Sequence, residues 1–433
     1  MKCIKCGTDN KLKERTANQG RCVKCNHPFA FEPTSMGKIK ITDPLFAKVL
    51  SDISANNTLF FTPKQLFYFL NLRLANKSYS SVFSSLFVYL FWSVVIGLGS
   101  TNLTNGNQEI AALVLFIFNS FYVFNLFQNT DSRKLNPKIR RANARVLQII
   151  GIIILGGGIS ASILIISSFY AFTLSVLMGM VSIYLGTQQL QNTGLSTQEF
   201  LFSQNEFESW VNRWRQINGL IVKILPSPRE DNTLTTFNPD VTAYSFDRLV
   251  VCDRATIAQL LIANNFHFEN NCAILSITGY PQGIFETMMQ MLRRNPDLKV
   301  YALHDCSPQG MSLVHHLRTS PKWFQDSDII IIDIGLTPRQ IIAAKRGMFI
   351  QSSPESAQAA KKLTGEISPN LSADEIEFLE SGKFVELESF TPQRLIQILQ
   401  KGIAGSQNLE SDDSGLFLVG DTGNDMYVVQ SFG

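Results

Sequence analysis

Four long runs of apolar residues dominate the middle of the chain. They cover residues 80–99, 109–128, 146–168 and 170–190. Each run is about 20 residues long, which at the rise of an α-helix matches a hydrocarbon core of about 30 Å. None of the runs contains Lys, Arg or Asp, and Glu109 lies only at the entrance of the second. The pattern predicts four transmembrane helices within residues 80–190.

The charged residues between these runs predict how the helices are oriented. The first connection contains no Lys or Arg. The middle connection carries a group of basic residues: Arg133, Lys134, Lys138, Arg140, Arg141 and Arg145. Because basic loops remain in the cytoplasm, the middle connection and both termini are expected on that side. We therefore expect an integral membrane protein whose soluble domains face the cytoplasm.

The spans contain no charged group of the kind that usually marks a path for ions or solutes. The third span instead carries small residues, which favour close packing of helices. They are Gly151, Gly156, Gly157, Gly158 and Ala161. Anchoring in the lipid bilayer, or docking to another membrane protein or complex, is therefore favoured over transport.

Amphipathic patterns flank the spans. Residues 42–78 predict a small helical, winged-helix-like segment, in which Thr62 and Pro63 begin a helix. Residues 191–239 predict an amphipathic helix followed by a proline-rich linker. Residues 403–433 predict a polar linker and a C-terminal hairpin, because two apolar segments flank the turn-forming sequence DTGND.

Four of the seven cysteines lie close to the N-terminus, within residues 1–34. They form two Cys-x-x-Cys pairs separated by 15 residues: Cys3, Cys6, Cys22 and Cys25. Four thiolates at this spacing suit a tetrahedral Zn²⁺ ion in a closed, structural site. The sequence predicts a zinc ribbon in a reducing compartment, since the pattern does not resemble a disulfide framework.

Residues 240–402 alternate short apolar runs with helical patterns. The apolar runs are 248–253, 272–278, 299–305 and 328–335. Between the second and third run, apolar residues recur at helical spacing. This alternation predicts an α/β domain with a mainly parallel sheet. Ligands of such sheets bind beyond the carboxyl ends of the strands, where Asp253 and Asp305 fall.

The sequence RLVVCDRATIAQLL…CAILSITGYPQG…VYALHDCSPQG…IIIIDIGL resembles the Toprim domain of the meiotic double-strand-break transesterases and of the topoisomerase VI A subunit. The matching motifs occur in the family's order: Gly279-Tyr280-Pro281, Asp305, Pro308, Gly310 and Gly335-Leu336. The resemblance implies a Mg²⁺ site made of a Glu after the first strand and two Asp in one loop.

Two of those three carboxylates are missing here. Cys252 stands in place of the Glu and Ser307 in place of the second Asp, so Asp305 alone remains. Asp253 is expected on the opposite side of its strand. Because Mg²⁺ prefers several carboxylate oxygens, it is not expected to bind. The resemblance then implies a ligand site or pseudo-site formed by Cys252, Asp253, Gly279, Tyr280, Asp305, Ser307 and Gly310.

Two alternatives would restore a metal to this site. A softer ion such as Zn²⁺ could use Cys252, His304, Asp305 and Cys306. Glu286, one helical turn away, could replace the missing Glu.

An earlier segment, FTPKQLFYFL, resembles the family's motif that ends in the tyrosine attacking DNA phosphate. Tyr68 takes the nucleophile position, and Lys64 stands where Arg is usual. If the protein is active, the resemblance implies Tyr68 and Asp305 as catalytic residues. Otherwise Tyr68 is expected to pack in a helix beside the bilayer.

These patterns favour a membrane-anchored, non-catalytic Toprim-like protein that acts as a binding, scaffold or assembly partner at the cytoplasmic face. The alternative is a membrane-tethered, DNA-binding or DNA-cleaving transesterase of the topoisomerase VI A type. The net charge of +3 does not favour nucleic acid as the partner.

Overall fold

A computed structural model describes residues 1–37, 39–77, 82–103, 108–131, 137–166, 168–192, 195, 197–228, 246–295, 297–344, 348–367 and 371–405. The chain divides into two compact units. The sheet unit comprises Met1–Arg73, Phe200–Ala344 and Met348–Gly433, and the helical unit comprises Leu74–Glu199 with Lys345–Gly347.

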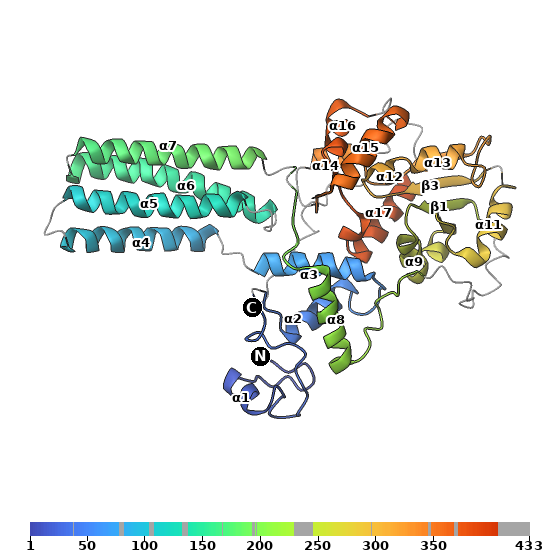
Figure 1. Cartoon of the computed structure of the whole chain (residues 1–433), viewed down its shortest axis with the longest axis horizontal. Coiled ribbons are helices and arrows are strands. Elements are labelled where there is room, and N and C mark those ends of the chain that lie inside the picture. Colours follow the sequence, from blue (N-terminus) through green and yellow to red (C-terminus); the bar gives the residue numbers. More distant parts are fainter. Residues whose placement is uncertain are drawn as a thin grey trace. The chain divides into compact units, whose positions relative to one another are not determined.

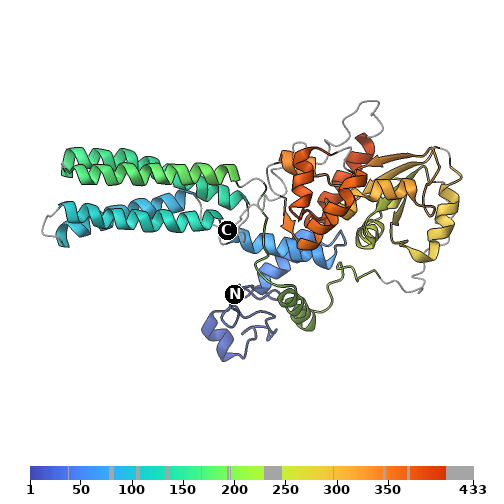
Figure 2. The same ribbon diagram turned by 45° about the horizontal axis from the view of Figure 1, so that its top comes forward.

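The helical unit contains long helices and one short π-helical segment. They are α4 (Val82–Leu103), α5 (Gln108–Asp131), α6 (Pro137–Ala161), η1 (Ser162–Ile166) and α7 (Phe169–Asn192). The helices lie side by side (Figure 2). Buried apolar side chains from all four α-helices form their common core, among them Tyr89, Val123, Leu147, Ile150 and Met178.

Three helices in the described part of the chain are long and apolar enough to cross a membrane. The candidate spans are Glu109–Thr130, Arg140–Leu164 and Phe169–Leu190. The prediction of four spans is therefore supported for three. The span predicted at 80–99 lies in α4, where the apolar stretch among the described residues, Ser84–Gly97, is shorter.

The middle connection is shorter than predicted, because α6 begins at Pro137. Arg140, Arg141 and Arg145 therefore lie in the first turns of α6 rather than in a loop. Arg133 and Lys134 lie outside the described residues.

Small residues let α6 approach α7 closely. A Cβ atom added at Gly151 would lie 2.6 Å from the Ile183 side chain and 2.9 Å from the carbonyl oxygen of Gly179. At Gly158 it would lie 2.6 Å from the hydroxyl of Ser175. Any larger side chain at these positions would separate the two helices.

The N-terminal part of the sheet unit packs around aromatic side chains. The helices here are α1 (Leu12–Ala17), α2 (Asp43–Ile53), α3 (Pro63–Lys77) and α8 (Gln204–Asn218). The ring of Phe46 on α2 lies 4.9 Å from that of Trp214 on α8 and 5.3 Å from that of Phe31. Ser203 caps α8, so the amphipathic helix expected within residues 191–239 begins at Gln204.

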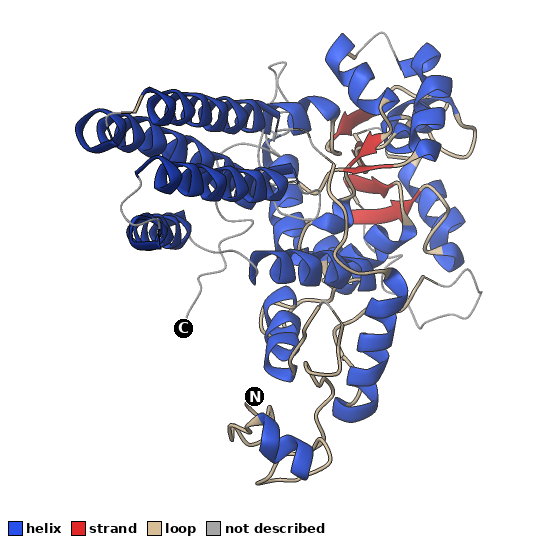
Figure 3. Ribbon diagram, turned by 60° about the vertical axis from the view of Figure 1, so that its left-hand side comes forward, coloured by secondary structure: helices blue, strands red, loops and turns tan. Residues whose placement is uncertain are grey.

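The larger part of the sheet unit contains a four-stranded parallel sheet, shown in red in Figure 3. Its strands are β1 (Arg248–Cys252), β2 (Cys272–Ser276), β3 (Lys299–Leu303) and β4 (Ile330–Asp333), in the order β2-β1-β3-β4. This confirms the predicted mainly parallel sheet. Strands β1, β2 and β3 are buried over almost their whole length, as expected when helices cover both faces.

Helices and a short strand pair complete this domain (Figure 1). After β1 come α9 (Ala255–Ala263) and α10 (Phe266–Glu269), and after β2 come η3 (Gln282–Ile284) and α11 (Phe285–Leu292). After β3 come α12 (Pro308–Met311) and α13 (Leu313–Thr319), and after β4 comes α14 (Pro338–Ala344). The remaining elements are β5 (Gln351–Ser352), α15 (Pro354–Ile367), α16 (Ala373–Glu380), β6 (Lys383–Phe384), η5 (Leu387–Ser389) and α17 (Pro392–Gly405). The C-terminal hairpin expected within residues 403–433 lies outside the described residues.

Candidate functional site

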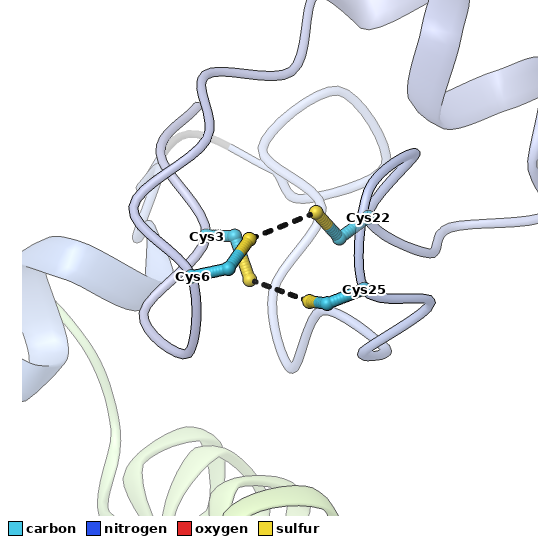
Figure 4. Close-up of side chains that lie close together, drawn as sticks. All are labelled: Cys3, Cys6, Cys22 and Cys25. Carbon is cyan, nitrogen blue, oxygen red and sulfur yellow. Dashed lines mark hydrogen bonds between the residues drawn. The ribbon is translucent and has the colours of Figure 1, made fainter.

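The four N-terminal cysteines converge on one point (Figure 4). The sulfur atoms of Cys3 and Cys25 are 3.7 Å apart, and those of Cys6 and Cys22 are 3.6 Å apart. A zinc ion with Zn–S bonds of about 2.3 Å requires sulfur atoms about 3.8 Å apart, whereas a disulfide requires about 2 Å. The four side chains therefore fit a tetrahedral zinc ion, as predicted, and would hold it as thiolates.

Two similar turns place the cysteine pairs. The carbonyl of Cys3 accepts a hydrogen bond from Gly7 N–H, and that of Cys22 accepts one from Asn26 N–H, both at 2.9 Å. Gly7 and Asn26 have positive φ angles of 71° and 55°, which Gly and Asn tolerate best. Hydrogen bonds from the backbone N–H groups of Cys25 and Lys24 lower the pKa of the Cys22 thiol, which favours a thiolate ligand.

A second group of polar side chains lies at the carboxyl edge of the parallel sheet. Asp253 follows β1, and Asp305 follows the neighbouring strand β3. The Asp253 carboxylate accepts a hydrogen bond of 2.9 Å from the backbone N–H of Asp305. The expectation that Asp253 points away from Asp305 is wrong, because β1 ends at Cys252 and strand alternation stops there.

Arg254 joins Asp305 to two further carboxylates. Its guanidinium lies 2.7 Å from Asp305 Oδ2 and 3.0 Å from Glu386 Oε1. Glu388 Oε2 lies 3.6 Å from the same guanidinium. Asp305, Glu386 and Glu388 are buried, whereas the Arg254 side chain is partly exposed. We call Asp253, Asp305, Glu386 and Glu388 the acidic cluster.

The segment between β6 and η5 brings the two glutamates to this edge. Val385 forms an isolated antiparallel bridge with Cys306, directly beside the Asp305 loop. The backbone N–H of Leu387 donates a hydrogen bond of 2.6 Å to Asp305 Oδ1. Glu386 and Glu388 lie on either side of Leu387, so both side chains are fixed next to Arg254.

Helix α3 contributes Tyr68 and Lys64 to the same cluster. The Tyr68 hydroxyl donates a hydrogen bond of 2.6 Å to Glu386 Oε2, and Lys64 Nζ lies 2.7 Å from Glu386 Oε1. The side-chain amide of Gln351 donates a further hydrogen bond to the Tyr68 hydroxyl. Tyr68 is 1% exposed and its ring packs against Phe349. Tyr68 therefore packs in a helix, α3, and its hydroxyl lies at the acidic cluster.

The start of α3 is also bonded to the cluster. The Thr62 hydroxyl donates a hydrogen bond of 2.8 Å to Glu388 Oε1, and the Gln65 side chain donates one of 3.0 Å to the carbonyl of Phe390. Both side chains are buried. Since buried polar groups are costly without partners, these bonds fix the register of α3 against the segment 386–390.

Burial and neighbouring charges set the protonation of the cluster. Burial, with a contribution from Asp253, raises the pKa of Asp305 to about 8. Burial also raises the pKa of Glu388. For Glu386 the effect of burial is outweighed by Lys64 and Arg254, which lower its pKa. Its two cationic neighbours therefore favour the ionised form of Glu386.

The same environment holds Tyr68 in its neutral form. Burial, followed by the negative charge of Glu386, raises the pKa of Tyr68 well above its usual value. A phenol that donates its proton to a buried carboxylate is a structural hydrogen-bond donor. To attack phosphate it would have to lose both this proton and its hydrogen bond to Glu386.

Three carboxylates of the acidic cluster, those of Asp305, Glu386 and Glu388, lie around the Arg254 guanidinium. Within the described residues, the four N-terminal cysteines are the only group of three or more Cys, His, Asp or Glu ligand atoms that all lie within 4.8 Å of one another. The guanidinium supplies positive charge at the place where the carboxylates meet.

His304, at the end of β3, is buried and bonded through both ring nitrogens. Nε2 lies 3.0 Å from the Asp333 carboxylate and Nδ1 lies 2.8 Å from the carbonyl oxygen of Asp305. Burial alone would lower its pKa, but Asp333 outweighs burial and raises the pKa to about 9. The alternative in which His304 binds a soft metal would require it to give up one of these bonds.

Two glycines of the Toprim-like motifs, Gly310 and Gly335, leave space for Asp305 and His304. A Cβ atom at Gly335 would overlap the His304 ring, and one at Gly310 would overlap the backbone carbonyl of Asp305. Ser307 caps α12 by accepting a hydrogen bond of 3.1 Å from Gly310 N–H. Ser307 is therefore part of the loop's backbone structure.

Other residues singled out in the sequence have structural surroundings of their own. Cys252 and Cys306 are fully buried, and burial raises the pKa of both thiols well above the usual value. Ser276 N–H, at the end of β2, donates a hydrogen bond to the carbonyl of Tyr280, and Tyr280 N–H donates one to the Ser276 hydroxyl, in the turn that contains Gly279. Glu286 is exposed on α11.

Sequence reasoning missed Glu386 and Glu388 as members of the site. The sequence contained a signal for these two residues. The segment FVELESF alternates apolar residues with glutamates, and glutamates are rarely buried unless they are paired. Nothing in their local sequence indicates that Arg254, Lys64 and Tyr68 are those partners.

The parallel sheet carries the acidic cluster at its carboxyl edge, where ligands of such sheets bind. Residues 249–397 match the family model of the Toprim domain shared by Spo11 and the A subunit of topoisomerase 6. This part of the chain is a Toprim domain of that family, which confirms the resemblance found in the motifs. The match includes Asp253, Asp305, Glu386 and Glu388 and excludes Tyr68. A comparison of the whole sequence with curated proteins gives no match.

Proposed function

We propose that this protein is a membrane-anchored, non-catalytic Toprim protein that acts as a binding or assembly partner at the cytoplasmic face. The observation that carries the proposal is the position of Arg254 between Asp305, Glu386 and Glu388. Phosphoryl transfer by such a site needs a divalent cation that neutralises the charge on phosphate. A guanidinium bonded to the same carboxylates opposes binding of that cation.

The state of Tyr68 supports the same proposal. The hydroxyl is buried, hydrogen-bonded to Glu386 and Gln351, and carries a raised pKa. These contacts tie α3 to the Toprim domain, so Tyr68 acts as a structural link between the two.

Membrane anchoring is supported by the surface of the helical unit. Large apolar side chains are exposed on its helices, including Phe87, Phe121, Ile152, Leu164, Phe169 and Tyr184. Exposed apolar side chains over helices of this length suit a lipid environment. The cytoplasmic orientation rests on the basic residues near the start of α6 and on the reduced cysteines.

The experiment measures Mn²⁺ binding by the detergent-solubilised chain, using isothermal titration calorimetry and an Arg254→Ala variant. The natural chain is expected to bind no Mn²⁺ at the acidic cluster. Arg254→Ala removes the internal cation, so measurable Mn²⁺ binding is expected to appear in this variant. Arg294→Ala, an exposed arginine on the same domain, is the matched control and should change nothing.

A different result would reverse the proposal. Micromolar Mn²⁺ or Mg²⁺ binding by the natural chain, abolished by Asp305→Asn, would show that Arg254 leaves room for a metal.

The second candidate is a membrane-tethered transesterase that cleaves DNA. One observation favours it: Tyr68, distant in sequence from the Toprim domain, is placed at the acidic cluster. The same purified chain should then nick or relax supercoiled DNA with Mg²⁺ or Mn²⁺, and Tyr68→Phe should abolish the reaction. Under the preferred proposal, neither the natural chain nor the Tyr68→Phe variant cleaves DNA.

A further inference from the structure

Two cationic side chains lie on the solvent side of the acidic cluster. The side chains of Lys64 and Arg254 are 41% and 36% exposed. The three carboxylates around Arg254 are buried, and the most exposed of their side chains, that of Glu386, is only 6% exposed. This edge of the sheet therefore presents positive charge to solvent above negative charge that is buried.

The two cations are close together because they share an acceptor. Lys64 Nζ lies 2.7 Å and Arg254 Nη2 lies 3.0 Å from the same oxygen, Glu386 Oε1. Both keep hydrogen-bond donors that the cluster does not use. The Lys64 ammonium group has three N–H donors, of which the described residues accept one. Arg254 Nη1 lies 3.6 Å from Glu388, which is too far for a hydrogen bond.

Helix α9 adds further positive charge beside Arg254. Arg254 is the N-cap residue of this helix of 9 residues, and its side chain forms no cap hydrogen bond. In the first turn, the Thr256 hydroxyl is buried without a hydrogen-bond partner among the described residues. The positive end of the helix dipole thus lies at the carboxyl edge of the sheet, where ligands of parallel sheets bind.

The buried carboxylates oppose an anion less than their number implies. Burial raises the pKa of Asp305 to about 8 and also raises the pKa of Asp253 and that of Glu388. These groups therefore hold protons more readily than free carboxyl groups do, whereas an arginine stays charged. The balance of charge next to the two exposed cations is shifted towards positive.

We propose that Lys64 and Arg254 bind the phosphate group of a phosphate monoester without a metal ion. The phosphate accepts hydrogen bonds from Lys64 Nζ and Arg254 Nη1, and the buried carboxylates hold both cations in place. Two cations match the charge of a monoester, close to −2, better than the single charge of a phosphodiester. Soluble phosphate compounds and lipid headgroups both offer this group. The inference rests on the proposed function, because it takes the acidic cluster to be free of metal.

Isothermal titration calorimetry of the detergent-solubilised full chain, without added divalent cations, tests the site. The probes are inorganic phosphate and dioctanoyl phosphatidic acid, and the natural chain is expected to bind a single phosphate group saturably. Lys64→Gln should weaken binding about tenfold, the effect of losing one charge-assisted hydrogen bond. Lys64→Arg keeps the charge and should retain most of the affinity. Lys401→Gln, at an exposed lysine on α17, is the matched control and should change nothing.

The two probes distinguish the sources of the phosphate group. Equal affinities support a soluble phosphate monoester as the ligand, and tighter binding of phosphatidic acid supports a lipid headgroup. No binding by the natural chain would overturn the proposal, as would unchanged affinity in Lys64→Gln. Equal losses in Lys64→Arg and Lys64→Gln would also overturn it, because the charge at this position would then not matter.

Mn²⁺ separates this inference from the proposed function. A chain that binds neither phosphate nor Mn²⁺ would refute the phosphate site and leave the proposed function standing. Phosphate binding that requires Mn²⁺ would refute both.

Discussion

Arg254 sets the charge of the acidic cluster through contacts that no local pattern encodes. Its guanidinium bonds to Asp305 and Glu386 and lies close to Glu388, while Lys64 adds a second cation to Glu386. The loss of the expected second Asp at Ser307 is therefore accompanied by two glutamates from another segment. Arg254 supplies a positive charge next to three of these carboxylates.

At the residue scale, His304 leads to a prediction of how the stability of the sheet unit depends on pH. Its folded pKa of about 9 lies above the usual value of 6.5, so the folded state binds a proton that the unfolded chain releases. This contribution is fully present below pH 6.5 and is lost as the pH rises through about 9. We expect the free energy of unfolding of the sheet unit to fall by on the order of 1–3 kcal/mol across this window.

Asp333→Asn provides the control for this prediction. The variant removes the carboxylate that holds the proton on His304, so it should be less stable below pH 6.5 and show a flatter pH profile. Chemical denaturation followed by tryptophan fluorescence reports the sheet unit, which contains Trp210, Trp214 and Trp323. An equally steep profile in the variant would contradict the assignment.

At the scale of elements, two short segments position the chemistry. The cysteine turns at Gly7 and Asn26 point four sulfur atoms at one another, and local spacing was sufficient to predict them. The segment 385–388 was not predictable in the same way. Its position depends on the bridge between Val385 and Cys306, which joins residues far apart in the chain.

The zinc ribbon is tested by its metal content. The natural chain should contain about one zinc per molecule, and Cys22→Ser should lose most of it, since a closed site needs all four ligands. Lys24→Ser changes an exposed neighbour and should retain the metal. Inductively coupled plasma mass spectrometry measures the zinc, and limited proteolysis of residues 1–34 reports the loss of structure. Full zinc in Cys22→Ser would refute a four-cysteine site.

At the scale of the whole molecule, the chain combines a helical unit with exposed apolar surface and a sheet unit that carries both candidate sites. The hydrophobic runs alone predicted the helices of the helical unit. In the first run, however, the apolar stretch among the described residues, Ser84–Gly97, is shorter than a membrane-spanning helix. The segments before and after the helical unit belong to one sheet unit, so α3 and the Toprim domain share a core despite their separation in sequence.

Membrane extraction tests whether the helical unit is inserted in a lipid bilayer. The natural chain should remain in the membrane pellet after alkaline carbonate treatment and enter solution with detergent, because apolar spans partition into lipid. A variant in which residues 82–192 are replaced by a Gly-Ser linker should be released without detergent. Release of the natural chain by carbonate alone would contradict membrane insertion.

The sequence by itself determined the features that depend on spacing and periodicity. These are the cysteine pairs, the apolar helices, the alternating strands and helices, and the Toprim motifs around Asp305. Such signals are local, because each is carried by residues within a few turns of one another. The tertiary structure alone decided which side chains meet at the acidic cluster, since Arg254, Glu386 and Tyr68 come from separate segments and are joined only when the core of the sheet unit forms.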